Sequence, residues 1–273
     1  MQSKTLSIAG FDGSGGAGIQ ADLKTFSAFG CYGMTVLTAL PIQNTRGVKS
    51  CYELPLNAIE DQLEAIFSDI RPDSIKIGML FKAEIVQLVA SYLKKHAAGI
   101  PIVLDPVLLA KSGDSLLLPE ALEVLKSSLI PLATIITPNL PEAQALLSRS
   151  TSISAEEMPF VAEELLKLGP CAVLLKGGHL AADHSNDLLL DKNGLSFWFD
   201  SLKIQSKNTH GTGCTLSAAI ASGLALGLNL AKACELAKKY ISNAIIAAKD
   251  EKIGHGNGPV HHFYHLWPAI DKI

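Results

Sequence analysis

The sequence lacks the features that mark secreted and membrane proteins. Its five cysteines are odd in number and irregularly spaced, with no C-x-x-C pair, which argues against a disulfide framework and a zinc knuckle. No apolar run approaches the roughly 20 residues that cross a bilayer. The apolar run near the N-terminus is too short for a signal peptide. These absences predict a cytoplasmic protein.

Charge of one sign is also scarce. The formal net charge is −3 and the sequence pI is about 6.2, with no long block of like charges. Nucleic acids and anionic membranes attract concentrated basic patches. We therefore expect neither as a partner, and a small molecule as the ligand.

What the chain does contain is a regular alternation of short apolar runs and helical patterns. Strands are predicted at 5–9, 34–39, 75–77, 102–104, 134–136 and 172–175, with a hairpin of 187–191 and 197–200. Helices are predicted at 16–29, 56–70, 83–94, 140–147, 155–168, 213–226 and 230–249. This order predicts one domain over residues 1–273, an α/β three-layer α-β-α sandwich with a mostly parallel central sheet. In such sheets ligands bind beyond the carboxyl ends of the strands.

A glycine-rich loop at 10–18 follows the first predicted strand. Gly13, Gly15 and Gly18 satisfy G-x-G-x-x-G, a dinucleotide-binding pattern. That reading needs an acidic residue near the end of the second strand, and no Asp or Glu lies between Asp22 and Glu53. A tight turn between strand and helix is one alternative. We favour a third reading, in which the glycines bring backbone groups close to a small ligand.

The segment 208–214, Asn-Thr-His-Gly-Thr-Gly-Cys, precedes an apolar helix. Gly211 and Gly213 let consecutive backbone N–H groups point one way at the helix start, which favours an anion. The same field would favour a thiolate at Cys214. On position alone, a cysteine at a helix start is more often a small buried hydrophobe.

Two further segments carry polar groups at strand ends. Asn139 with Glu142 three residues later forms a capping-box pattern, and both side chains are also suited to Mg²⁺ and its water shell. Lys176 ends an apolar strand and could contact phosphate, or extend along the surface into solvent. The P-loop pattern G-x-x-x-x-G-K-[ST] is absent.

Taken together, these segments closely resemble the hydroxymethylpyrimidine/phosphomethylpyrimidine kinases of thiamine biosynthesis, a branch of the ribokinase-like superfamily. The resemblance covers nearly the whole chain. Its ordered motifs are SGGAGIQADLKTF (14–26), YGMTVLTALPIQNT (32–45), KIGM (76–79), LDPVLLAKSG (104–113), ITPNLPEA (136–143), LLKGGHL (174–180) and NTHGTGCTLSAAIA (208–221). Together these motifs are specific where any one would be weak.

On the phosphate side, the resemblance implies that Cys214 takes the proton of the substrate hydroxyl. Most members of the superfamily carry Asp at that position. The catalytic and ATP-binding residues that it implies are Cys214, Lys176, Gly211, Gly213, Thr212, Asn139 and Glu142. The implied cofactors are ATP and Mg²⁺, with a monovalent cation as a further candidate. Glu142 and Asn139, with Asp105 as a weaker candidate, would hold the Mg²⁺ indirectly or through water.

On the acceptor side, the resemblance implies a pocket formed by Gln43, Gly10, Asp22, Met79 and Val107. The carboxamide of Gln43 would pair with the aminopyrimidine, because it offers a donor and an acceptor together. Phe11 departs from the family, which usually has a small or hydroxylated residue there, and it would narrow the pocket mouth.

The implied activity is ATP-dependent phosphorylation of 4-amino-5-hydroxymethyl-2-methylpyrimidine, and then of its monophosphate to the diphosphate, by a homodimer. One alternative is a pyridoxal/pyridoxine kinase of the same superfamily. A second is a catalytically inactive pyrimidine-binding regulator. The presence of Lys176, Asn139, Glu142 and the Gly-Thr-Gly-Cys loop argues against the regulator, because a pure binder needs no phosphate-transfer groups.

Overall fold

The computed structural model describes residues 2–108, 117–180 and 184–267 of the 273-residue chain. Its centre is an eight-stranded sheet in the order β10-β9-β8-β7-β6-β5-β1-β2. The strands are β1 (Lys4–Ala9), β2 (Tyr32–Leu37), β5 (Ser74–Ile77), β6 (Ile102–Leu104), β7 (Ile135–Ile136), β8 (Ala172–Leu175), β9 (Asp187–Asp191) and β10 (Ser196–Phe199). In this sheet β2, β1, β5, β6, β7 and β8 pair in parallel, and β9 and β10 are antiparallel at one edge. The mostly parallel sheet and its edge hairpin are confirmed.

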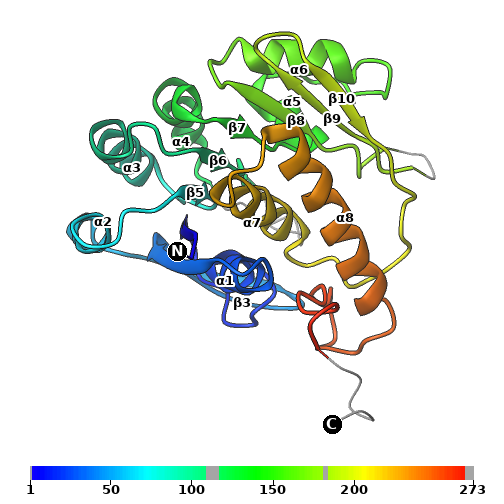
Figure 1. Cartoon of the computed structure of the whole chain (residues 1–273), viewed down its shortest axis with the longest axis horizontal. Helices are drawn as coiled ribbons and strands as arrows, with labels where there is room; N and C mark the ends of the chain where they lie inside the picture. The colour runs from blue at the N-terminus through cyan, green and yellow to red at the C-terminus, as the bar shows by residue number, and fades with distance from the viewer. Residues whose placement is uncertain (1, 109–116, 181–183, 268–273) are drawn as a thin grey trace.

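Helices cover both faces of the sheet (Figure 1). They are α1 (Gly18–Ala28), α2 (Leu56–Phe67), α3 (Ala83–His96), α4 (Pro119–Val124), α5 (Leu140–Leu146), α6 (Met158–Leu166), α7 (Thr212–Ala225) and α8 (Leu230–Ala248). A π-helical turn (Leu125–Leu129) and a 3-10 turn (Ile130–Leu132) follow α4. None of the helices in the described part of the chain is long and apolar enough to cross a membrane.

The sheet has a hydrophobic core on each face, because the side chains along a strand alternate between the two faces. Ile102 and Leu104 of β6 pack in the cluster that includes α2 to α6, whereas Val103 between them packs in the cluster with α1, α7 and α8. Successive side chains of a strand point to opposite faces, so each buried strand contributes to both cores. The three-layer arrangement is therefore confirmed.

A second, two-stranded sheet was not predicted. It consists of β3 (Ala39–Asn44) and β4 (Gly47–Glu53), antiparallel, with an irregular register between Ile42 and Gln43. Half of its side chains are exposed and β3 contains Pro41, so it lacks the continuous apolar run of a buried strand. This hairpin matters because it carries Gln43.

Candidate functional site

The amino end of α7 is held by a close contact between two glycine-rich loops. Gly211, the residue before the helix, adopts a left-handed conformation (φ 78°), and no side chain among the described residues caps it. A Cβ atom on Gly211 would lie 1.7 Å from the carbonyl oxygen of Gly16. A Cβ atom on Gly16 would in turn lie 2.4 Å from Cδ2 of His210. Glycine is required at both positions because the two loops pack too closely for a Cβ atom.

Asp12 fastens the two loops together. It is fully buried and accepts hydrogen bonds from the backbone and hydroxyl of Ser14, from the backbone of Gly16 and Ala17, and from Nε2 of His210 at 2.8 Å. Burial by itself would raise the pKa of Asp12, but the bonds from His210 and Ser14 prevail and lower it to about 2. Asp12 therefore joins the loop at 10–18 to the loop before α7. The sequence predicted that the backbone of this loop approaches a small ligand. At Gly16 the group that lies close to the backbone is the side chain of His210.

Lys176 lies at the carboxyl end of β8 between two acids. Its Nζ is 3.0 Å from Oδ1 of Asp105 and 3.8 Å from Oε2 of Glu142, and its side chain is only 14% exposed. Although burial disfavours the charged form, the two carboxylates raise the pKa of Lys176 above its ordinary value. Lys176 is thus a fixed buried cation, and the alternative of a surface lysine is excluded.

This cluster adjoins the start of α7. A Cβ atom on Gly213 would lie 3.3 Å from Oδ2 of Asp105 and 3.5 Å from Nζ of Lys176. Asp105 follows β6 and also accepts a hydrogen bond from the hydroxyl of Thr137. The end of β6, the end of β8 and the first turn of α7 therefore meet at one point, where the amino end of a helix and a lysine both favour an anion.

Glu142 caps a helix and also lies among charged groups. Asn139 and Glu142 form a capping box, with both bonds at 2.8 Å, so the local reading is confirmed. The same carboxyl lies in the Lys176 cluster. Burial, opposed by Lys176 and reinforced by Asp105, raises the pKa of Glu142 to about 7. One carboxyl of the cluster is therefore largely protonated below neutral pH.

The residues fit a Mg²⁺ ion held with its water and phosphate ligands. No group of three or more His, Cys, Asp or Glu in the described part of the chain could form an all-protein metal site. Mg²⁺ commonly uses one or two carboxylates and completes its shell with water and phosphate. Asp105 and Glu142 supply two carboxyls, and a divalent cation beside them would oppose both the burial and the charge of Asp105 that raise the pKa of Glu142.

Cys214 lies in the first turn of α7 and is half-buried. Burial raises the pKa of its thiol to about 11; Lys76 is the main group that opposes this rise, while Asp22 and Asp105 add to it. The expectation that the helix start would favour a thiolate is therefore wrong for the unliganded protein. Desolvation outweighs the field of the helix terminus, which acts only over its first turn.

Three of the predicted acceptor residues come together around the Gly10–Phe11 peptide. A Cβ atom on Gly10 would lie 3.0 Å from Sδ of Met79. Gln43, on the unpredicted hairpin, donates from Nε2 to the carbonyl oxygen of Phe11 at 3.2 Å. The backbone of Phe11 donates to Ala39, at the start of the same hairpin. The loop at 10–18 thus links this group of side chains to α7.

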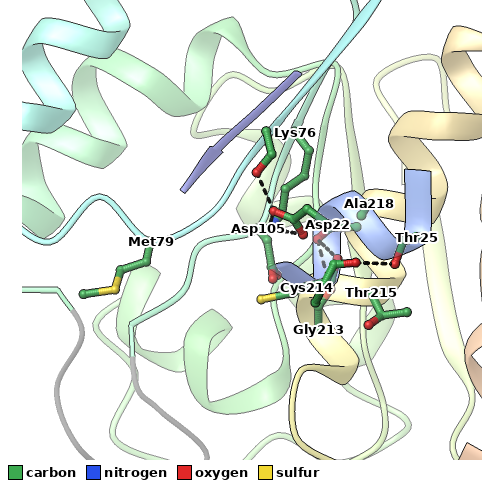
Figure 2. A network of polar contacts seen from close by, with 12 residues as sticks. Asp22, Thr25, Lys76, Met79, Asp105, Gly213, Cys214, Thr215 and Ala218 are labelled. Atoms are coloured by element: carbon green, nitrogen blue, oxygen red, sulfur yellow. Dashed lines mark hydrogen bonds and ion pairs between the residues drawn. The ribbon is translucent and has the colours of Figure 1, made fainter. Parts of the chain in front are cut away.

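Asp22 occupies a different place from the one expected in the pocket wall. It is fully buried, and its oxygens accept from Nζ of Lys76 at 2.8 and 2.9 Å and from the hydroxyl of Ser7 at 2.5 Å. Figure 2 shows this pair beside Cys214, with Asp105 close by. Because both of its oxygens are occupied by protein groups, Asp22 presents no surface to a substrate.

Two other predicted residues adjoin the site through the backbone, and the N–H of Val107 donates to the carbonyl oxygen of Asp105 at 2.8 Å. Thr212 is the first residue of α7, and Val107 is half-buried two residues beyond Asp105. Residues 109–113 of the predicted motif at 104–113 lie outside the described residues.

Sequence reasoning missed three polar side chains at this site, those of Asp12, His210 and Lys76. His210 and Lys76 lie inside quoted motifs and Asp12 lies in the glycine-rich loop at 10–18, but no role was assigned to any of them. Lys76 interrupts an otherwise apolar strand, and a lone lysine in such a strand signals a buried partner. For Asp12 and His210 the only signal was their position beside glycines.

Comparison with known proteins agrees with this geometry. The phosphomethylpyrimidine kinase family model matches residues 12–261. A hydroxymethylpyrimidine/phosphomethylpyrimidine kinase from Escherichia coli is 50% identical over 96% of this chain and 98% of its own length. A crystal structure of phosphomethylpyrimidine kinase from Clostridium difficile has 48% identity and a TM-score of 0.79, covering 89% of this chain and 100% of that one.

A pyridoxal kinase is also similar. The ADP complex of the Bacillus subtilis enzyme has 36% identity and a TM-score of 0.88, covering 97% of this chain and 98% of that one. The family model and the high identity to named kinases nevertheless agree with each other over nearly the whole chain. The chain therefore belongs to the phosphomethylpyrimidine kinase family, whose members are phosphotransferases with a ribokinase-like fold.

Proposed function

We propose that this protein transfers the γ-phosphoryl group of ATP to 4-amino-5-hydroxymethyl-2-methylpyrimidine, and then phosphorylates the monophosphate to the diphosphate, in thiamine biosynthesis. The observation that carries the proposal is the meeting of Lys176, Asp105 and the first turn of α7 beside the Gly10–Met79–Gln43 group. The 50% identical relative carries the corresponding name. Phosphoryl transfer depends mainly on positioning and on neutralising charge, and the cluster supplies both.

On the phosphate side, Lys176 and the N–H groups of Gly211 to Cys214 bind the transferring group, with Thr212 beside the ATP phosphates. Mg²⁺ would be held by Asp105 and Glu142, with Asn139 keeping Glu142 in place, and would supply neutralisation of phosphate charge. ADP and an ATP analogue are bound in solved relatives, which supports ATP as the donor.

On the acceptor side, Gln43 reads the aminopyrimidine, because its amide is already oriented by Phe11. Met79 and Val107 offer apolar surface to the ring, and Gly10 lets it approach the backbone. Cys214 accepts the hydroxyl proton as the acceptor oxygen attacks the γ-phosphorus. The O–H bond breaks, and the S–H and O–P bonds form. The bond between the γ-phosphorus and the bridging oxygen of ATP breaks, so ADP leaves with that electron pair and with the negative charge that the thiolate carried.

The second candidate function is phosphorylation of pyridoxal, which the similarity to pyridoxal kinases favours. Purified protein should be assayed with ATP on the pyrimidine alcohol, its monophosphate and pyridoxal, with and without Mg²⁺. We expect the highest kcat/KM with the pyrimidine compounds and activity only with Mg²⁺. A much higher kcat/KM with pyridoxal would overturn the substrate assignment, and pyrimidine binding without turnover would favour a regulator.

The role of Cys214 is tested by Cys214→Ala. A general base contributes about 10²–10⁴-fold, so kcat should fall by at least about 100-fold while pyrimidine binding is retained. The control is Cys171→Ala, at an exposed cysteine that lies just before β8. Equal turnover in the two variants would remove Cys214 from the reaction.

The single-domain organisation, the homodimer, the cytoplasmic location and the monovalent cation remain predictions. Sedimentation of the purified protein tests the dimer. Activity in potassium salts compared with tetramethylammonium salts tests the cation.

A further inference from the structure

Beneath the start of α7 lies an ion pair that the mechanism above does not use. Lys76 projects from β5 and Asp22 from α1, and both side chains are 0% exposed. Nζ of Lys76 binds both oxygens of Asp22, and Ser7 of β1 binds one of them. Gly78 leaves the room, because a Cβ atom there would lie 2.8 Å from Nζ of Lys76. Three neighbouring elements of the fold therefore hold this ammonium in one place.

Stability alone does not account for such a pair. Moving two charges out of water is costly, and replacing a buried ion pair by apolar residues of similar volume is often neutral or stabilising. Removing only one partner, in contrast, strands a buried charge. A buried ion pair with this desolvation cost, located beside a cysteine at the proposed site, therefore indicates an electrostatic role.

The group beside it is Cys214 (Figure 2). The charges that act on its thiol come from three directions: Lys76 on β5, Asp22 on α1 and Asp105 after β6. The backbone of Gly18 also bonds to it and favours the thiolate. Lys176, with Glu142 behind it, faces the neighbouring residue Gly213. Lys76 is the foremost of the groups that favour the thiolate, and Cys214 in turn favours the charged form of Lys76.

We propose that Lys76 is a positioning residue for phosphoryl transfer: Asp22 holds its buried ammonium under the first turn of α7, where it stabilises the thiolate of Cys214. The inference rests on the proposed role of Cys214 as the base. Lys76 contacts no substrate, because Asp22 and the sheet enclose it. Asp22 has the opposite electrostatic effect, since its negative charge disfavours the thiolate. Its two bonds fix the position of the ammonium, while Cys214 and Asp105 also favour the charged form of Lys76.

The opposite signs of the two charges allow a test that structural damage cannot imitate. Lys76→Met removes the cation and should raise the pKa of the Cys214 thiol. Asp22→Asn removes the anion and should lower it. Below its pKa a thiol is alkylated in proportion to its thiolate fraction, and that fraction changes about tenfold per pH unit. At pH 8 we expect iodoacetamide to modify Cys214 about tenfold more slowly in Lys76→Met, and faster in Asp22→Asn, than in the unaltered protein.

Peptide mass spectrometry of the full-length protein separates Cys214 from the other cysteines. Exposed Cys171 in the same samples is the internal control, and its rate should not change. The double variant Asp22→Asn, Lys76→Met leaves no stranded charge, so it keeps the test valid if Lys76→Met does not fold. It should also react more slowly than the unaltered protein, since the effect of Lys76 on Cys214 exceeds that of Asp22.

Shifts in the same direction for both single variants, or unchanged rates in folded protein, would overturn the proposal. Steady-state kinetics then separate it from the function on which it rests. We expect Lys76→Met to lower kcat about tenfold with little change in KM for the pyrimidine. If alkylation shifted and kcat did not, the electrostatic link would stand and the assignment of Cys214 as the base would fail.

Discussion

Adding a single methyl group to Gly211 should separate the two loops of the site. In Gly211→Ala the new Cβ atom would lie 1.7 Å from the carbonyl oxygen of Gly16, and real Cβ atoms essentially never come within 3.0 Å of a neighbour. One loop must therefore move by more than about 1 Å. A misplacement of that size at a reacting centre can cost about 100-fold in rate.

Gly227 provides the matched control. It has nearly the same left-handed conformation (φ 81° against 78°), but a Cβ atom there meets nothing within 4 Å. It lies just beyond the other end of α7. Both substitutions impose the strain of a left-handed alanine, about 1–2 kcal/mol. Only Gly211→Ala adds the collision.

The assay is kcat/KM with ATP and the pyrimidine alcohol, together with urea unfolding of each variant. We expect Gly227→Ala to lose about 1 kcal/mol of stability and to retain its activity. Gly211→Ala should lose kcat/KM about 100-fold. If the two variants had kcat/KM values within about threefold of each other, the interlock of the loops would not control the site.

Two further predictions follow from the charged groups. The pKa of Glu142 is raised from 4.5 to about 7, so its stabilising contribution is complete below pH 4.5 and is lost as the pH rises through about 7. Glu142→Gln preserves the capping box and serves as the reference. Between pH 5 and pH 8 the free energy of unfolding in urea should fall by up to about 3 kcal/mol more in the protein with Glu142 than in this variant. Parallel pH dependences of the two proteins would refute the raised pKa. Asp12→Asn should cost about 2 kcal/mol or more and lower kcat, because an amide cannot accept all five hydrogen bonds. Asp191→Asn is its control, at the last residue of β9, where the side chain bonds to the turn before β10. It should change stability far less, so equal losses would contradict the role of Asp12.

The outline of the fold was accessible from the sequence because buried parallel strands are short, continuous apolar runs. Residues 102–104 and 172–175 were predicted with the bounds that β6 and β8 have in the structure. The half-exposed β3–β4 hairpin, with a proline and an irregular register, has no such run, so it was missed. Motif order identified Lys176, Asp105 and Glu142, but not that one lysine lies between the two acids.

The sequence by itself determined the α/β order and the family, and it predicted an anion-binding loop before α7. These depend on local patterns and on motifs that lie within a few residues of each other. Only the tertiary structure decided which charges meet. Asp22 and Lys76 are 54 residues apart and Asp12 and His210 are 198 apart, yet each pair is in hydrogen-bond contact. The protonation of Cys214 was also decided there, because a pKa depends on burial and on charges that other segments bring close, and these outweigh the local field of a helix terminus.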